Sequence, residues 1–436
     1  MRIISLDEES RKNILERLLK RSPGNYGKYN ETVAEIVERV KSEGDRALLE
    51  YTNRFDCDKI NASNIRVTEA EVAAAYERVD ERLLTTIRKA LVNIRSYHEK
   101  QKRYSWFDTT QDGTMLGQKI TPLQAAGVYV PGGKAVYPSS VLMNIVPARI
   151  AGVGKIIMAT PCNRQGEITP AVLVAAKEAG ADEIYKMGGA QAVAAMAFGT
   201  ESIPKVDKIT GPGNIFVALA KKAVSGYVGI DSIAGPSEIL ILADESADPV
   251  YVAADLLSQA EHDEMASAIL VTTSRNLAEK VSKEASRFIK ELSRKEIIRK
   301  SLDQYGYILV ADTKEAALET VNQIASEHLE IMTKNPFEDM MKVQNAGAIF
   351  LGENSSEPLG DYFAGPNHIL PTNGTARFFS PVSVDDFVKK SSIIYYSREA
   401  LQKVHEDIEY FAENEQLTAH ANSIKVRFRP EPDSCN

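Results

Sequence analysis

The run Gly127-Val128-Tyr129-Val130-Pro131-Gly132-Gly133 is a short β-branched segment that stops at a turn, and it decides the fold of the region around it. Similar apolar runs follow at residues 155–159, 182–186 and 206–209. Amphipathic helical patterns lie between them, at residues 139–151, 169–179, 190–198 and 214–224. Strands that alternate with helices of about 10–15 residues indicate parallel βαβ units.

The alternation restarts further along the chain. Strands are expected at residues 239–243, 268–272, 307–311 and 348–351, and helices at 249–261, 275–292, 313–326 and 336–345. The sequence therefore predicts an α/β protein with two Rossmann-like domains, each an incomplete doubly wound sheet. A small N-terminal arm and a C-terminal helical tail flank them. We expect the arm at 1–25, the first α/β domain at 26–128 plus 238–382, the second at 129–237 and the tail at 383–436.

Composition narrows the functional classes. The chain has 436 residues, a formal charge of −8, and apolar and charged fractions of 44% and 26%, typical of a globular protein. The acidic balance argues against a nucleic-acid surface. Its apolar runs are too short to span a bilayer, and the N-terminus turns acidic at once, so we expect a cytoplasmic enzyme. The three cysteines are scattered, which argues against a disulfide framework or a thiolate metal site.

Four glycine-rich turns interrupt the α/β pattern, at residues 131–133, 188–191, 211–214 and 235–237. Such a turn lets backbone N–H groups approach a phosphate closely at the start of a helix. Any one of them is more simply a tight strand-to-helix connection. Four in succession favour a nucleotide, although neither of the familiar nucleotide-binding glycine motifs occurs.

Polar side chains gather in a few short segments. Gln259 and His262 are three residues apart on a helical pattern, so they share a face, and both are suitable N/O ligands for zinc. Glu327-His328 joins two groups that could act as general bases. Taken singly, each segment is better explained as ordinary surface or capping structure.

Further polar residues lie in a Gly/Pro-rich loop and in the tail. The loop contains Asp361 and His368, and the tail contains Glu415 and His420. Loops of this kind, held by a rigid scaffold, often bear binding residues. His98 and His405 lie on charged helical patterns and are expected at the surface.

Together these segments resemble the histidinol dehydrogenase family along essentially the whole chain. The most specific stretch is 230–262, which runs from Ile-Asp-Ser-Ile-Ala-Gly-Pro-Ser-Glu to Ser-Gln-Ala-Glu-His. Further motifs match in the same order: Gly-Val-Tyr-Val-Pro-Gly-Gly, Gly-Gly-Ala-Gln-Ala, Gly-Pro-Gly-Asn, Ser-Glu-His-Leu, Gly-Asp-Tyr, Gly-Pro-Asn-His-Ile-Leu-Pro-Thr and Leu-Thr-Ala-His.

The resemblance implies NAD-dependent, four-electron oxidation of L-histidinol to L-histidine through a bound aldehyde, at the end of histidine biosynthesis. It implies a zinc ion held by Gln259, His262, Asp361 and His420. Implied substrate contacts are Ser237, Gln259, His262, His328, Asp361, His368, Glu415 and His420. Implied NAD contacts are Tyr129, Gln191 and Asn214, and the implied acid/base residues are Glu327 and His328.

The resemblance also implies a homodimer. Glu415 and His420 of the tail would then reach across to the active site of a second copy. Zinc and the catalytic residues are expected in the first α/β domain, and NAD in the second. Since histidinol bears an imidazole and an amine, zinc is expected to hold and orient the substrate rather than to activate water.

Three alternatives remain at this point. The chain could oxidise another small polar alcohol, although His368 and Glu415 favour an amino alcohol with an imidazole. It could be a zinc hydrolase with Glu327 as the base, although it has no HExxH motif and several glycine-rich turns. It could also be a ligand-binding protein without activity, although it retains Glu327, His328 and the full ligand set.

Overall fold

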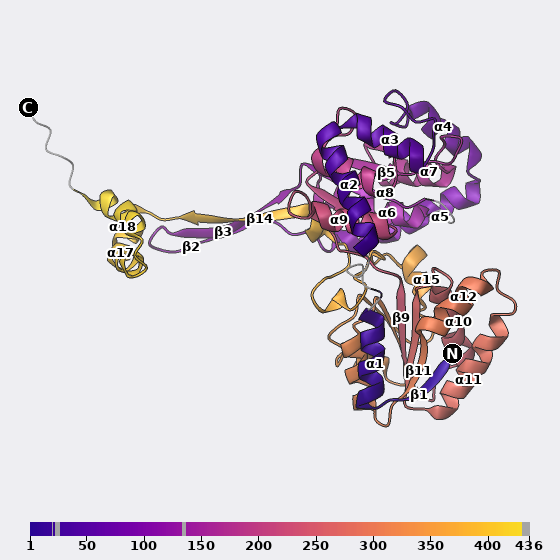
Figure 1. Ribbon diagram of the computed structural model, residues 1–436. Coiled ribbons are helices and arrows are strands. Elements are labelled where there is room, and N and C mark those ends of the chain that lie inside the picture. The colour runs from indigo at the N-terminus through magenta and orange to yellow at the C-terminus, as the bar shows by residue number, and fades with distance from the viewer. Residues whose placement is uncertain (20, 22–26, 133–136, 430–436) are drawn as a thin grey trace, which may run out of the picture. The chain divides into compact units, whose positions relative to one another are not determined.

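The computed structural model describes residues 1–19, 21, 27–132 and 137–429 (Figure 1). Its contacts separate the chain into two compact units. The first, here the α/β unit, consists of residues 1–102 and 122–387. The second, here the hairpin unit, consists of residues 103–121 and 388–436. No helix among the described residues is long and apolar enough to cross a membrane.

A six-stranded parallel sheet forms one half of the α/β unit. Its strand order is β1 (Arg2–Ser5), β11 (Gly306–Val310), β10 (Ser267–Thr272), β9 (Glu238–Ala243), β12 (His328–Met332) and β13 (Ala348–Leu351). The central strands β9 and β10 are buried along their whole length. Strands covered on both faces are continuous apolar runs, which is why 239–243 was recognisable in the sequence.

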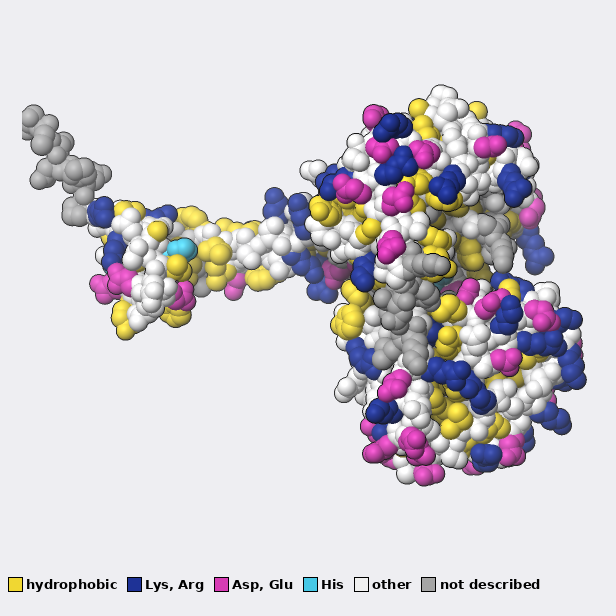
Figure 2. Space-filling view, viewed as in Figure 1, with side chains coloured by type: hydrophobic (Ala, Val, Ile, Leu, Met, Phe, Trp, Pro, Cys, Tyr) yellow, Lys and Arg dark blue, Asp and Glu magenta, His cyan; other side chains and the backbone are white. Residues whose placement is uncertain are grey.

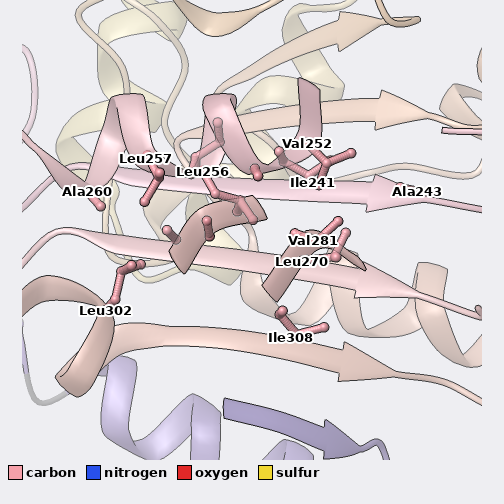
Figure 3. Packing of buried hydrophobic residues seen from close by; sticks show 14 of the residues in the cluster. Ile241, Ala243, Val252, Leu256, Leu257, Ala260, Leu270, Val281, Leu302 and Ile308 are labelled. Atoms are coloured by element: carbon pink, nitrogen blue, oxygen red, sulfur yellow. The ribbon is translucent and has the colours of Figure 1, made fainter. Parts of the chain in front are cut away.

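Helices cover both faces of this sheet. One face packs against α10 (Pro249–Ala260), α11 (Arg275–Phe288) and α12 (Lys295–Tyr305). Figure 3 shows Ile241, Leu270 and Ile308 of the strands pointing toward Leu256 and neighbouring helical side chains. The other face packs against α1 (Glu8–Leu19) and α13 (Lys314–Ile324). A short helix, α14 (Pro336–Met340), contacts β12 and β13.

A five-stranded parallel sheet forms the other half of the α/β unit. Its order is β6 (Glu183–Lys186), β5 (Lys155–Thr160), β4 (Ala125–Tyr129), β7 (Lys208–Thr210) and β8 (Gly229–Ile230). The helices that connect these strands are α6 (Pro138–Ala151), α7 (Pro170–Ala179), α8 (Gly189–Phe198) and α9 (Ile215–Val224). These helices contact an outer layer formed by α2 (Gly27–Glu43), α3 (Asp45–Phe55), α4 (Glu69–Arg78) and α5 (Glu81–Glu99).

The hairpin unit contains a three-stranded sheet, β14 (Val388–Tyr395), β3 (Met115–Pro122) and β2 (Trp106–Thr109). It continues into α16 (Arg398–Gln402), α17 (His405–Asn414) and α18 (Thr418–Lys425). Large apolar side chains of this unit are exposed, among them Trp106, Phe107, Ile394, Tyr410 and Phe411. Figure 2 shows hydrophobic side chains on the surface of this unit. An exposed apolar surface of this kind is typical of an interaction site.

The predicted α/β class is confirmed, and the eight predicted strands are present with shifts of one or two residues. One element of the six-stranded sheet, β1, was not predicted as a strand. The start of β12 was expected only as a helix-to-strand junction at Glu327-His328, without bounds for the strand. The predicted helix 275–292 is shorter than expected, and a separate helix, α12, follows it.

The four-part division of the chain stays a prediction, to which the structure adds three observations. Residues 2–5 of the expected arm pair with β11, so they belong to the sheet. The helices at 27–99 contact the helices of the five-stranded sheet, whereas the sequence grouped them with residues 238–382. The strand at 115–122 pairs with β14, from the expected tail, and the strand at 106–109 pairs with the strand at 115–122.

Candidate active site

A cavity of about 530 Å³ in the α/β unit is lined by residues that follow strands of one sheet and precede strands of the other. The glycine-rich turns at 131–132 and 211–213 follow β4 and β7 of the five-stranded sheet. Ser237 and Glu327, in contrast, precede β9 and β12 of the six-stranded sheet. The cavity therefore joins the carboxyl edge of one sheet to the amino edge of the other, an arrangement that the usual strand-end rule does not predict.

Eight residues expected at the site line this one cavity. They come from both halves of the α/β unit: Asn214, Ser237, Gln259, His262, Glu327, His328, Asp361 and His368.

One residue, Glu238, holds both Glu327 and His328 through its backbone. Its N–H donates to Glu327 Oε2 at 2.8 Å, and its carbonyl oxygen lies 3.0 Å from His328 Nδ1. Because a carbonyl can only accept, Nδ1 must carry the hydrogen in that contact. His328 Nε2 is buried and has no hydrogen-bond partner among the described residues. In the neutral ring Nε2 is therefore the nitrogen that can take up a proton.

Burial and charge set the pKa values of this pair. Burial raises the pKa of Glu327 to about 8, although the neighbouring His328 opposes the rise. Burial lowers the pKa of His328, but the carboxylates of Glu327 and Asp361 outweigh it and raise that pKa to about 10. His328 Nε2 lies 3.8 Å from Asp361 Oδ1. A bound cation beside Asp361 would offset part of this effect on His328, because it would neutralise the carboxylate.

Three N/O donors meet in the cavity at a spacing suited to a metal ion. One ligand atom each from His262, Glu357 and Asp361 lie within 4.8 Å of one another. Burial raises the pKa of Asp361, but the neighbouring imidazoles of His328 and His368 lower it to about 2, so the group is a carboxylate. His262 opens to solvent, yet partial desolvation lowers its pKa and favours the neutral, ligating imidazole. Donors of this type suit zinc.

Gln259 is buried beside these donors, at 1% exposure. Its amide is satisfied when the nitrogen donates to Glu357 Oε1 at 3.3 Å and the oxygen accepts from the Glu238 N–H at 3.2 Å. Glu238, Gln259 and Glu357 therefore form one network at the wall of the cavity, and Gln259 lies next to the donor group as expected.

Glu357 was missed in the sequence. It is buried, Ser258 Oγ donates to its Oε2 at 3.1 Å, and its pKa is raised to about 7, chiefly by burial. Glu357 begins α15 (Glu357–Leu359), which continues into a π-helical turn, Gly360–Ala364, that bears Asp361. The spacing of four residues between Glu357 and Asp361 was the available signal, because residues four apart on a helix share a face.

The loop after this turn is anchored by α5 and α6. Asn367 Nδ2 donates to the Met143 carbonyl at 2.6 Å and lies 3.3 Å from His98 Nε2. His368 Nδ1 lies 3.0 Å from the Asp361 carbonyl, and its Nε2 lies 3.1 Å from Ser140 Oγ. The expectation that His98 lies at the surface is wrong, since it is fully buried. His405 is partly exposed and stacks on the Phe428 ring.

Two of the three residues expected to contact NAD are buried against the turn at 188–191 and do not line the cavity. Tyr129 and Gln191 are 3% and 1% exposed. The Tyr129 hydroxyl accepts from the Gly189 N–H at 3.1 Å, and Asp56 Oδ2 accepts from the Gly188 N–H at 2.8 Å. These side chains therefore shape the turn at 188–191. The third residue, Asn214, lines the cavity and caps α9 through Oδ1.

Glu415 and His420 lie in the hairpin unit. Both are exposed, and both line a surface hollow of about 810 Å³ between α17 and α18. Apolar side chains, including Ile408, Phe411 and Leu417, line the same hollow. The structure thus places these two polar groups together on an exposed, apolar surface.

Comparison with known proteins gives a consistent result. The family model described as histidinol dehydrogenase matches residues 19–428. The histidinol dehydrogenase of Caldanaerobacter subterraneus subsp. tengcongensis is 58% identical over 415 residues, 95% of this chain and 96% of that one. That of Bacillus subtilis is 57% identical over 416 residues, 95% and 97% of the two chains. The crystal structure of histidinol dehydrogenase from Elizabethkingia anophelis matches at a TM-score of 0.92, with 39% identity over 98% of each chain.

Proposed function

Because the chain belongs to the histidinol dehydrogenase family, oxidoreductases of histidine biosynthesis, we propose that it oxidises L-histidinol to L-histidine with two equivalents of NAD. The observation that supports this most is the cavity wall, where Glu327 and His328 share the Glu238 backbone beside the donors His262 and Asp361. We further propose that it acts in the cytoplasm, where small metabolites and NAD are at hand.

In the first oxidation, His328 takes the proton of the substrate hydroxyl. Its Nε2 suits this role because it is buried, lines the cavity and has no partner among the described residues. NAD supplies the hydride acceptor for both oxidations. The Glu238 carbonyl fixes the ring through Nδ1, so Nε2 keeps one direction during the transfer.

In the second oxidation, Glu327 activates the water that adds to the bound aldehyde. One carboxylate oxygen is held by the Glu238 N–H, which leaves the other to accept a proton from water. After His328 has released its first proton to solvent, the hydrate loses the second hydride while His328 accepts the proton of a hydrate hydroxyl. A carboxyl with a pKa near neutrality suits this role, because it can both accept and release the proton.

Gln259, His262 and Asp361, with His420 of the partner subunit, would hold a zinc ion that binds and orients the imidazole and amine of the substrate. The donor set fits this ion, because it offers a neutral imidazole, an ionised carboxylate and an amide within one cavity. Glu357 adds a second carboxylate beside them.

Ser237 and His368, which line the same cavity, would contact the substrate. Glu415 of the partner subunit would meet the substrate from a second copy. Tyr129, Gln191 and Asn214 would form the NAD site; the first two act by shaping the turn at 188–191. The exposed apolar side chains of the hairpin unit support a homodimer, since a partner would cover them.

The test is direct. Purified enzyme is supplied with L-histidinol and NAD, reduced cofactor is followed by its absorbance, and product is identified by chromatography. L-histidine as the product supports the proposal. Oxidation of other small amino alcohols in preference to L-histidinol would assign a different substrate. Absence of any reduced cofactor, from enzyme shown to be folded and loaded with zinc, would refute the dehydrogenase function and leave the hydrolase and binding alternatives.

A further inference from the structure

A buried ion pair lies behind the glycine-rich turn at 211–214. Lys221 of α9 pairs with Asp231, and their side chains are only 2% and 3% exposed. Lys221 Nζ also donates to the Gly211 carbonyl at 3.0 Å, and Asp231 Oδ2 accepts from the Gly211 N–H at 2.8 Å. The pair therefore holds both polar backbone groups of one residue at once.

The other side of this turn faces the cavity. Gly211, Gly213 and Asn214 line it. Gly211 has a φ of +118°, and a Cβ at this position would lie 2.0 Å from the Tyr129 carbonyl oxygen, so only glycine lets the turn approach β4 this closely. The turn is held in two ways: Gly211 packs against β4, and its backbone carbonyl and N–H are bonded to Lys221 and Asp231.

Stability alone is a poor explanation for this pair. Burial of two charges costs free energy that their attraction only partly returns, and apolar replacements of similar volume are often as stable. A buried pair that holds both backbone groups of a turn is better explained by the shape that it imposes. That shape matters where a ligand must meet backbone groups that are already in place.

We propose that Lys221 and Asp231 are positioning residues for dinucleotide binding, which hold the 211–214 turn in its binding conformation before the cofactor arrives. The proposal rests on the proposed function, because it takes NAD as the ligand of this turn. Lys221 acts from behind the turn and does not line the cavity, whereas Asp231 lines it beside Gly211. The effect of the pair should therefore fall on NAD and leave L-histidinol unaffected.

The decisive variant is the double substitution Lys221→Met with Asp231→Asn. It leaves no unpaired buried charge, and the asparagine oxygen can still accept from the Gly211 N–H, while the Gly211 carbonyl loses its donor. Lys222→Met is the matched control, because the neighbouring residue on α9 is exposed. NAD affinity is measured by titration of the zinc-loaded enzyme, and KM is measured separately for NAD and for L-histidinol.

We expect the dissociation constant and the KM of NAD to rise about tenfold in the double variant, since loss of one hydrogen bond that orders a binding turn is worth about that factor. The KM for L-histidinol, and kcat at saturating NAD, should stay near the values of the wild type and the Lys222→Met control. Unchanged NAD binding, or equal loss for both substrates in a folded variant, would overturn the proposal. Wild-type enzyme that fails to bind NAD would instead refute the proposed function.

A second measurement needs no variant. Hydrogen exchange over the segment 207–217 of the wild-type enzyme reports whether the turn exists without cofactor. A prepared turn should exchange slowly in NAD-free enzyme and gain little protection when NAD is added. Rapid exchange that becomes slow only with NAD would show that the ligand forms the turn, and the proposal would be wrong.

Discussion

Replacement of Glu327 by Gln should separate the two oxidations. The substitution keeps the size of the side chain, and the amide oxygen can still accept the 2.8 Å hydrogen bond from the Glu238 N–H. The substitution removes the basic carboxylate oxygen that, in the proposed mechanism, accepts a proton from the attacking water. Aldehyde oxidation should therefore fall by a factor of about 10² to 10⁴, the usual contribution of a general base. Oxidation of the alcohol, which uses His328, should fall much less.

The pH dependence of aldehyde oxidation gives a second quantitative test of the role of Glu327. Burial raises the pKa of Glu327 to about 8. The active form of a general base is the deprotonated one, so aldehyde oxidation by the wild type should increase with pH. Between pH 7 and pH 9 the ionised fraction of such a carboxyl rises from about one tenth to about nine tenths, and the rate should rise with it by roughly tenfold. The Gln variant should lose the part of this rise that Glu327 supplies, while deprotonation of His328, whose pKa is raised to about 10, contributes at higher pH.

Stopped-flow measurement of reduced cofactor tests both magnitudes, with L-histidinol supplied in one series and L-histidinaldehyde in the other. Glu330→Gln is the matched control. Glu330 is a fully buried carboxyl in β12, three residues after Glu327; it accepts from the Glu357 N–H at 2.7 Å and does not line the cavity. Equal losses in the two oxidations of the Glu327 variant would refute the role of Glu327 in activating water. A rise in rate between pH 7 and pH 9 that is as large in this variant as in the wild type would refute it too.

Three further predictions concern the metal, the partner subunit and the core. Removal of zinc by a chelator should abolish oxidation while the circular dichroism spectrum stays unchanged; full activity without metal would contradict the orienting role. Glu357→Gln should lower the affinity for zinc, measured in competition with a chelator, by about 10- to 100-fold. Inactive His262→Ala and His420→Ala variants, mixed in equal amounts, should regain about a quarter of wild-type activity through hybrid dimers, each with one intact site. No recovery from hybrids shown to form would exclude a shared site. Leu256→Ala, in the core shown in Figure 3, should lower the free energy of unfolding by about 2–5 kcal/mol and leave KM unchanged.

Much of the fold was predictable because it depends on local patterns. Buried central strands such as β9 and β10 are continuous apolar runs between turns. The bounds of β12 were not predicted because Glu330, fully buried, interrupts its apolar pattern with a carboxyl group that only its tertiary partners explain. β1 was missed because it is a short edge strand with polar ends, and its only strand partner among the described residues, β11, lies far away in the sequence.

For the site, the sequence predicted candidate residues but not their geometry. The family resemblance supplied the residues, and eight of them do line one cavity. The support behind them depends on contacts between segments far apart in the chain. His98 looked like a surface residue because its helix is charged, yet it lies against Asn367 of the loop that bears His368. The backbone of Glu238, which holds Glu327 and His328, has no sequence signal at all.

The number of reduced cofactors formed per L-histidinol consumed tests the central claim most directly. The enzyme, loaded with zinc, is given a limiting amount of L-histidinol and excess NAD, and the absorbance of the reduced cofactor is followed to completion. Two successive hydride transfers at one site predict about two equivalents per substrate, with L-histidine as the product. A value of about one, with aldehyde released, would show that the site performs only the alcohol oxidation and would contradict the role proposed for Glu327.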